Sequence, residues 1–336
     1  MIGELREKDV LVQEQIRGYG RKTKEGVVLS LVEATYLLSL GKIDVIEKGR
    51  KLSFEELFKE GTKRIEGFEL IYTVYRDLRN RGYYPHYPSA DLKLYRRGKC
   101  AGEEPSWGIV RVLSEREHIT LSRLWNIVCS VEGLRKRLVI AIVDEEGDIT
   151  YYLVKTLSPK GECVDRMEGE VKGEATLLSD RAIVWSGELS RELHETQFFG
   201  TMLDEDRLHL SIVEVVYLVE EGVLTVTDVD GKKMSLEDVM ERGRTIDPHF
   251  EPKLIIYKDM RKRGLIPKTG YKFGSHFRVY KRLNEHSDYL LHITDTMPLP
   301  ELSKSVRLAH SVRKRMLFAN LIMDEVRYIE VEWFRP

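Results

Sequence analysis

The stretch Leu-Ser-Leu-Val-Glu-Ala-Thr-Tyr-Leu-Leu at residues 29–38 returns later in the chain as Leu-Ser-Ile-Val-Glu-Val-Val-Tyr-Leu-Val at residues 210–219. The two stretches lie 181 residues apart, and a turn glycine follows each, Gly41 in the first case and Gly222 in the second. Similarity of this kind within one chain is the sign of an internal repeat. The pair therefore predicts that the chain of 336 residues is a tandem duplication.

Two further pairs of segments extend the match. KGRKLSFEEL at 48–57 corresponds to DGKKMSLEDV at 230–239, and each holds a Ser that suits a helix N-cap, with Glu three residues on or nearby. FELIYTVYRDLRNRG at 68–82 corresponds to FEPKLIIYKDMRKRG at 250–264. Each of these predicts an amphipathic helix closed by a glycine, and Pro252 falls in the first turn, where its missing N–H costs little.

We predict two homologous domains, 1–157 and 172–336, joined by a polar, glycine-rich linker at 158–171. After the shared helix, each repeat continues with short strands, one helix and a last strand or two. In the second repeat this helix is predicted over 301–321. The alternation of helix and strand favours an α/β (α+β) fold, in which each repeat has an N-terminal α/β subdomain and a C-terminal mixed-sheet subdomain.

The composition excludes several classes of protein. The net charge is −1, so a nucleic-acid site must be a local basic patch and not a property of the whole chain. No apolar run approaches the ~18 residues that span a membrane, and the N-terminus lacks the apolar core of a signal peptide. Cys100, Cys129 and Cys163 match neither a zinc site nor a disulfide framework. We expect a soluble, cytoplasmic protein with reduced thiols.

A basic segment in the second repeat favours RNA binding. Residues 268–282, KTGYKFGSHFRVYKR, hold five Lys and Arg residues, no acidic residue and four interleaved aromatic residues. Cations pair with phosphates while aromatic faces stack on bases, so Lys272 and Arg278 are candidate RNA-binding residues. On composition alone, a charged hairpin with core aromatics explains this segment at least as well.

Tyr280, His286 and Lys314 together suit the cleavage of RNA by its own 2′-hydroxyl. His is the natural acid for the leaving 5′-oxygen, and Lys can stabilise the charged transition state without a metal. Tyr is a poor base at its ordinary pKa near 10. It needs cations nearby, such as Lys281, Arg282 or Lys314, to favour the phenolate; otherwise it orients the 2′-hydroxyl.

The predicted helix 301–321 places Arg307 and Lys314 on one face, because seven residues make two helical turns. A solvated basic face is the alternative interpretation. No Asp, Glu and His cluster has convincing spacing for Mg²⁺ or Zn²⁺, so we expect no metal or other cofactor and predict metal-independent cleavage.

The string GYKFGSHFRVY, EHSDYLLH and VRLAHSVRKRMLFA, within residues 270–319, closely resembles the catalytic domain of archaeal tRNA-splicing endonucleases. VEATYLL and YRDLRNRG in the first repeat are similar to the same family. The resemblance implies a nuclease-like C-terminal subdomain and a catalytic triad of Tyr280, His286 and Lys314. It also implies cleavage of a bulge–helix–bulge fold in precursor tRNA, with 2′,3′-cyclic phosphate and 5′-hydroxyl products. Arg307 and Trp333 match the pair of residues that pinch a bulged base.

The first repeat departs from the family pattern. It keeps Tyr95 and Lys136 but has Pro105 at the histidine position, so we interpret it as catalytically silent. The resemblance to fused members of the family implies a homodimer, in which the acidic loop of the silent repeat binds the active repeat of the partner subunit. The matching loop here holds four carboxylates, Asp144, Glu145, Glu146 and Asp148. An ordinary exposed acidic turn is the alternative.

Two other functions compete with this interpretation. A metal-dependent DNA nuclease would need a Glu-x-Lys motif on a strand, and the match at residues 251–253 is broken by Pro252. A non-catalytic RNA-binding or assembly subunit fits the duplication and the basic segment equally well. The presence of tyrosine, histidine and lysine together in one repeat favours the enzyme.

Overall fold

The chain forms two compact units in a computed structural model that describes residues 1–88, 90–163, 173–282 and 286–336. The first unit consists of Met1–Lys155, Thr296–Lys304 and Val331–Pro336. The second consists of Thr156–Asp295 and Ser305–Glu330. Most of the predicted linker, residues 164–171, lies outside the described residues.

Two segments from the end of the chain belong to the first unit, which the predicted halves 1–157 and 172–336 did not foresee. Strand β21 (Thr296–Pro298) pairs with β9 (His118–Thr120) in the first unit. The ring of Phe334 packs against that of Trp107, with centroids 5.9 Å apart. These contacts join residues that are far apart in the sequence, so no local sequence pattern predicts them.

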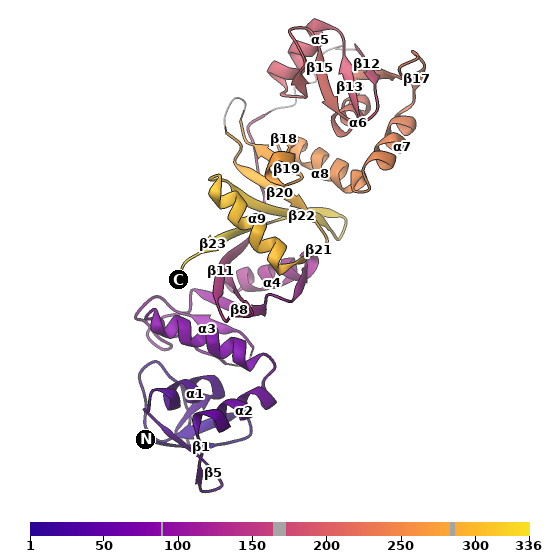
Figure 1. The fold of residues 1–336 in the computed structure, drawn as a ribbon. Helices are drawn as coiled ribbons and strands as arrows, with labels where there is room; N and C mark the ends of the chain where they lie inside the picture. Colours follow the sequence, from indigo (N-terminus) through magenta and orange to yellow (C-terminus); the bar gives the residue numbers. More distant parts are fainter. Residues whose placement is uncertain (89, 164–172, 283–285) are drawn as a thin grey trace. The chain divides into compact units, whose positions relative to one another are not determined.

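Each unit begins with a small mixed sheet and its helices (Figure 1). In the first unit the strand order is β3-β4-β2-β1-β5-β6. The bounds are Ile2–Leu5 (β1), Asp9–Val12 (β2), Arg21–Lys22 (β3), Val27–Ser30 (β4), Leu31–Ser39 (α1), Asp44–Glu47 (β5), Arg50–Lys51 (β6) and Phe54–Arg64 (α2). In the second unit the order is β14-β15-β13-β12-β16-β17. The bounds are Gly173–Leu177 (β12), Arg181–Val184 (β13), Gly187–Arg191 (α5), Thr201–Met202 (β14), Leu208–Ser211 (β15), Ile212–Glu220 (α6), Leu224–Thr227 (β16), Lys233–Met234 (β17) and Leu236–Ile246 (α7).

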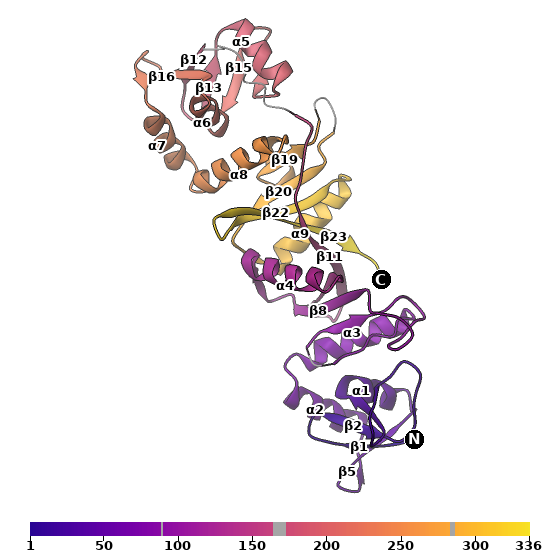
Figure 2. The ribbon, with the colours of Figure 1, turned by 180° about the vertical axis from the view of Figure 1, so that it is seen from behind.

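A helix then leads from the small sheet to a second set of strands (Figure 2). In the first unit the strand order is β7-β8-β10-β11. The bounds are Phe68–Asn80 (α3), Leu92–Leu94 (β7), Gly108–Ser114 (β8), Leu121–Gly133 (α4), Arg137–Val143 (β10) and Ile149–Leu157 (β11). In the second unit the order is β18-β19-β20-β22-β23. The bounds are Phe250–Lys262 (α8), Ile266–Thr269 (β18), Phe277–Tyr280 (β19), Tyr289–Ile293 (β20), Leu299–Ser311 (α9), Arg315–Ile322 (β22) and Glu325–Phe334 (β23). The start of α9, up to Lys304, and the end of β23, from Val331, belong to the first unit.

The predicted duplication and α/β (α+β) class are confirmed. Each set of strands is mixed. β8 runs parallel to β10 and β20 runs parallel to β22, whereas β7–β8, β10–β11 and β19–β20 are antiparallel pairs. The predicted caps also form. Ser53 and Ser235 cap α2 and α7 in capping boxes with Glu56 and Asp238. Among the described helices, none is both long enough and apolar enough to cross a membrane.

The prediction of one helix over 301–321 was wrong. Helix α9 ends at Ser311, and Arg313 adopts a left-handed backbone with φ 56°. The N–H of Arg313 donates to the His310 carbonyl at 3.0 Å and that of Lys314 to the Ala309 carbonyl at 2.8 Å, which is a Schellman motif. Lys314 therefore lies beyond the helix, and the argument that it shares a helical face with Arg307 fails. No glycine or proline marks the stop.

A buried carboxylate fixes the start of the first helix in each unit. Glu33 and Glu214, which are 0% and 6% exposed, complete the capping boxes of α1 and α6. Each is also met by a basic side chain from the region that leads into the second set of strands. His86 Nδ1 lies 3.2 Å from Glu33, and Lys268 Nζ lies 3.7 Å from Glu214. The pair links the two subdomains of each repeat.

We expect Glu214→Ala to lower the free energy of unfolding by about 3 kcal/mol, because it leaves the Lys268 ammonium buried without its carboxylate. Burial lowers the pKa of Lys268, and the charge of Glu214 counters this effect. Urea denaturation measures the change. The control is Glu56→Ala, which removes a capping-box contact of the same kind from an exposed surface. Equal losses in the two variants would contradict this account.

Candidate active site

The ends of three neighbouring strands bring two of the predicted catalytic residues to one edge of the sheet. Val279 in β19 pairs with Tyr289 in β20, and Tyr289 pairs in turn with Arg315 in β22. Tyr280 and Lys314 each lie one position outside these pairs. Because β19 runs antiparallel to β20, and β20 runs parallel to β22, both positions fall at the same end of the strands.

The segment that enters β20 from this edge holds His286. The Lys314 ammonium donates to the Ser287 carbonyl at 2.8 Å. Asp288 accepts from the Lys281 N–H at 3.0 Å, and its carboxylate lies 3.5 Å from the Lys281 ammonium. These contacts hold the two residues that follow His286, whose own side chain is exposed. The structure thus brings Tyr280, His286 and Lys314 to the same end of three adjacent strands.

Positive charge accumulates at this end of the strands. The Arg278 guanidinium lies 5.7 Å from the centroid of the Tyr280 ring. Its buried Nε has no hydrogen-bond partner within the described part of the chain. Burial lowers the pKa of Lys314, and the charges of Arg278 and Lys272 lower it further, while Asp288 opposes the change. An anion placed here would meet several cations that already repel one another.

Arg278 is a cation that the sequence did not single out for the place beside the tyrosine. Lys281 pairs with Asp288 as described above, and Arg282 pairs with Glu162 at 2.7 Å. The Arg278 guanidinium lies over the Tyr280 ring, and Lys314 lies at the same end of the strands. The place of Arg278 two residues before Tyr280 on the same strand directs both side chains to one face of the sheet, a signal present in the sequence.

A contact that the sequence did not reveal comes from the small sheet of the second unit. The ring of Phe198 packs edge to face on Tyr280, with centroids 5.6 Å apart. Phe198 follows the π-helical turn Glu192–Thr196 and has a left-handed backbone with φ 58°. For a residue with a side chain, that conformation costs roughly 1–2 kcal/mol. No periodicity or motif connects this segment with Tyr280.

The first unit repeats the arrangement of strands but lacks the histidine. Strands β7, β8 and β10 pair as β19, β20 and β22 do, which makes Tyr95 and Lys136 the equivalents of Tyr280 and Lys314. Lys136 Nζ donates to Ser106 Oγ at 2.5 Å. Pro105 stands before that serine, where the second unit has its histidine. A proline cannot act as an acid at that position.

The two residues predicted to pinch a base fall in different units. Arg307 is exposed on α9 in the second unit. Trp333 belongs to the first unit, is 40% exposed and has the Arg335 guanidinium 4.5 Å from its ring centroid. Their action as a pair stays a prediction.

In the acidic loop between β10 and β11, some carboxylates bind groups of the same chain and others face solvent. Asp144 Oδ1 accepts from the N–H groups of Glu146 and Asp148, at 3.0 and 2.9 Å. Glu145 pairs with Arg116 at 2.7 Å. Glu146 and Asp148 are exposed, and no cation within the described part of the chain lies at salt-bridge distance from either. These two carboxylates are available to a partner.

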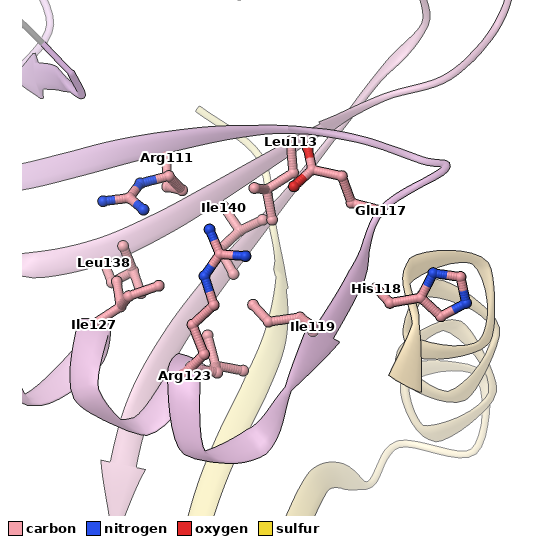
Figure 3. Close-up of a pocket in the computed structure, with 10 residues that line it drawn as sticks. Arg111, Leu113, Glu117, His118, Ile119, Arg123, Ile127, Leu138 and Ile140 are labelled. Atoms are coloured by element: carbon pink, nitrogen blue, oxygen red, sulfur yellow. The ribbon is translucent and has the colours of Figure 1, made fainter. Parts of the chain in front are cut away.

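A hollow beside α4 in the first unit is too small to be a ligand site. Apolar side chains of β8, β9, α4 and β10 line it, and Arg111 and Arg123 share the same space (Figure 3). Its volume is about 10 Å³, comparable to the room that one water needs. Within the described residues, no group of three His, Cys, Asp or Glu side chains is arranged to hold a metal ion.

Comparison with known proteins decides the family. The N-terminal domain of tRNA intron endonucleases matches residues 1–58 and again 173–240. The catalytic C-terminal domain of the same enzymes matches residues 68–151 and again 250–328. The chain belongs to the tRNA intron endonuclease family. Membership makes the protein an endoribonuclease of tRNA splicing, as the sequence resemblance implied.

Whole-length relatives support membership of the tRNA intron endonuclease family. The chain is 42% identical to the tRNA-splicing endonuclease of Methanosarcina mazei over 333 residues, which cover 96% of this chain and 94% of that protein. It is 42% identical to that of Methanococcoides burtonii over 321 residues, covering 93% and 92%. It is 36% identical to that of Halobacterium salinarum over 346 residues, covering 95% and 93%. These relatives come from archaea.

Proposed function

We propose that this protein cuts precursor tRNA at the bulge–helix–bulge folds of intron–exon borders, without a metal ion, as a homodimer in the cytoplasm. Tyr280, His286 and Lys314 of the second repeat form its active site, and the first repeat is silent. The relatives are tRNA-splicing endonucleases, which supports intron excision by this protein. A substrate with two borders suits an assembly with two active sites.

The proposed reaction is an internal transesterification. The 2′-hydroxyl oxygen before the cut attacks the adjacent phosphorus, so that an O2′–P bond forms and the P–O5′ bond breaks. Tyr280, as phenolate, takes the 2′-hydroxyl proton, and His286, as imidazolium, gives a proton to the departing 5′-oxygen. Lys314 and Arg278 stabilise the charge that develops on the phosphorane oxygens. The products are a 2′,3′-cyclic phosphate and a 5′-hydroxyl, and no water is consumed.

The observation that carries this proposal is the convergence at the ends of β19, β20 and β22. Tyr280, His286 and Lys314 all lie at this end of the strands, as does Arg278, whose buried Nε has no hydrogen-bond partner among the described residues. A phosphate oxygen would supply that partner. In the equivalent place the first repeat has Pro105, which supports a division into one working and one silent repeat.

Substrate preference tests the proposal. A bulge–helix–bulge RNA should be cut at both bulges, whereas each of its strands fully paired with an exact complement should stay intact. The paired duplex presents the same phosphates in a regular A-form helix, so it controls for general attraction to RNA. Equal cleavage of the two RNAs would contradict recognition of the bulges.

The acidic loop makes a separate prediction about the homodimer. Reversing Glu146 and Asp148 to Lys together should yield monomers and abolish cleavage, because these exposed carboxylates are the ones available to a partner subunit. Asp144 is kept, since it holds the loop. Sedimentation velocity and a cleavage assay measure the two effects.

The matched control for this prediction is the reversal of Glu7 and Glu14 to Lys. Both are exposed residues of the first unit, and their reversal gives the same change in net charge. The control should remain dimeric and active. A fully active dimer after reversal of Glu146 and Asp148 would reject the docking role.

A further inference from the structure

Phe198 lies against the side chain proposed as the base. Its ring meets that of Tyr280 edge to face, with centroids 5.6 Å apart and planes at 75°. We propose that Phe198 is a positioning residue, which holds the Tyr280 ring in the orientation that cleavage requires. This inference rests on the proposed function and deepens it, because it names a residue on which the tyrosine depends.

Two side chains lie close to the Tyr280 ring. Tyr280 is the last residue of β19 and is 8% exposed. Phe198 packs edge-on against the ring, and the Arg278 guanidinium lies 5.7 Å from its centroid. Because rotation about the first side-chain bond of a tyrosine swings the ring and the hydroxyl together, contacts with the ring restrict where the hydroxyl lies. Loss of the Phe198 ring would remove one of these two contacts.

Phe198 is itself fixed by its surroundings. The His194 ring stacks on it, with centroids 6.1 Å apart and planes at 19°. The Lys268 ammonium lies 4.9 Å from the Phe198 centroid, a distance typical of cation–π contacts. Lys268 donates to the Gly200 carbonyl at 2.6 Å and is paired with Glu214. The Phe198 ring, which packs on Tyr280, is therefore held by a lysine that is itself fixed by a hydrogen bond and an ion pair.

The backbone conformation of Phe198 shows that the surrounding structure, and not local preference, fixes the position of its ring. Its left-handed conformation is unfavourable for a residue with a side chain, and it follows a π-helical turn, a feature often found at functional sites. The next residue, Phe199, is fully buried, and its N–H donates to the Leu193 carbonyl at 2.9 Å. Unfavourable backbone persists where neighbours over-determine it, as they do here.

The buried capping glutamates align the two repeats in this region. The N–H of Gly20 donates to Glu33 at 3.2 Å, and that of Gly200 donates to Glu214 at 2.9 Å. The two glycines are therefore equivalent. The residues two positions before them, Gly18 in the first repeat and Phe198 in the second, are equivalent as well.

The silent repeat has no aromatic ring at this position. Gly18 is left-handed, with φ 78°, a conformation that glycine adopts without penalty. A Cβ added there would lie 2.1 Å from the Tyr84 ring, so the first repeat has no room for a larger residue. The ring stands in the repeat that carries His286, and there the chain tolerates unfavourable backbone to place it.

Three substitutions in the full chain test the role of Phe198. Under single-turnover conditions, Phe198→Ala and Phe198→Gly should each lower the rate of bulge–helix–bulge cleavage by about 10- to 100-fold, while RNA affinity changes less than about twofold. Phe198→Tyr keeps the ring and should remain within about threefold of the original rate. The glycine variant matters because it suits the left-handed backbone, so its loss of rate is not a loss of folding.

A double variant separates positioning from other effects. In a Tyr280→Phe background, adding Phe198→Ala should change the residual rate by less than about twofold, because two residues that act as a unit are not additive. Three outcomes would overturn the inference. Phe198→Ala could cut at the original rate, it could weaken RNA binding and change nothing else, or it could lower the rate equally in both backgrounds.

The same variants distinguish this inference from the proposed function. An inactive Tyr280→Phe variant beside a fully active Phe198→Ala variant would overturn the positioning role alone. A fully active Tyr280→Phe variant would overturn the role of Tyr280 as base, and the positioning role with it.

Discussion

Replacing His286 with Ala should lower the single-turnover rate of cleavage by about 10³-fold, which is within the range for loss of a positioned general acid. RNA affinity should remain close to that of the original protein, because the cations around Tyr280 are untouched. The physical reason is the leaving group: without a proton, the 5′-oxygen would depart as an alkoxide. Measurement of rate and affinity on the same RNA separates these effects.

His310→Ala is the matched control for that experiment. His310 is an exposed histidine of the same unit, on α9, and it has no part in the proposed chemistry. It should cut at the original rate. Cleavage retained by His286→Ala would remove His286 from the role of acid and would also remove the main difference between the two repeats.

Replacing Lys314 with Met should lower the rate by about 10²- to 10³-fold, because one preorganised charge is lost from the site where negative charge develops. Burial, followed by the charge of Arg278, lowers the pKa of Lys314. The required form is the protonated one, so its contribution is present below that lowered pKa and is lost as pH rises through it. The rate should therefore decline on the alkaline side at a lower pH than an ordinary lysine would give.

Lys314→Arg tests whether deprotonation of Lys314 causes the alkaline decline of the rate. An arginine stays charged at the same pH, so the variant should retain part of the activity and move the alkaline decline to higher pH. Lys304→Met is the control, because Lys304 is an exposed lysine of α9, paired with Glu301. An alkaline limb unchanged in Lys314→Arg would assign the decline to another group.

The duplication and its capped helices were predictable because they depend on local patterns. Ser53 and Ser235 each precede an acidic residue by three positions, and the structure closes both capping boxes. Gly82 and Gly264 end their helices in the left-handed conformation that a glycine in those places predicts. Short-range geometry decides such features, so the sequence displays them directly.

The end of α9 was not predictable in the same way. Arg313 takes the left-handed position that glycine usually occupies, and the strand β22 that follows starts with residues that also suit a helix. Lys314 nevertheless reaches the predicted site, but as the residue after a Schellman motif and not as part of a helical face. The prediction of its place depended on resemblance, which carries tertiary information that periodicity lacks.

The surroundings of Tyr280 depend on contacts distant in sequence. Arg278 was recognised as a basic residue of an RNA-binding segment, while its position over the tyrosine ring needed the strand to be in place. Phe198 comes from the small sheet of the same unit, and its contact with Tyr280 is set by how two subdomains pack. A single sequence holds no local signal for such packing.

The most direct test of the account is cleavage of an intron-containing precursor tRNA by the purified protein in excess EDTA, with analysis of the new ends. The account predicts excision at both borders, with a 2′,3′-cyclic phosphate on each upstream fragment and a 5′-hydroxyl on each downstream fragment. Cleavage that requires added divalent metal, or that leaves a 5′-phosphate and a 3′-hydroxyl, would contradict it.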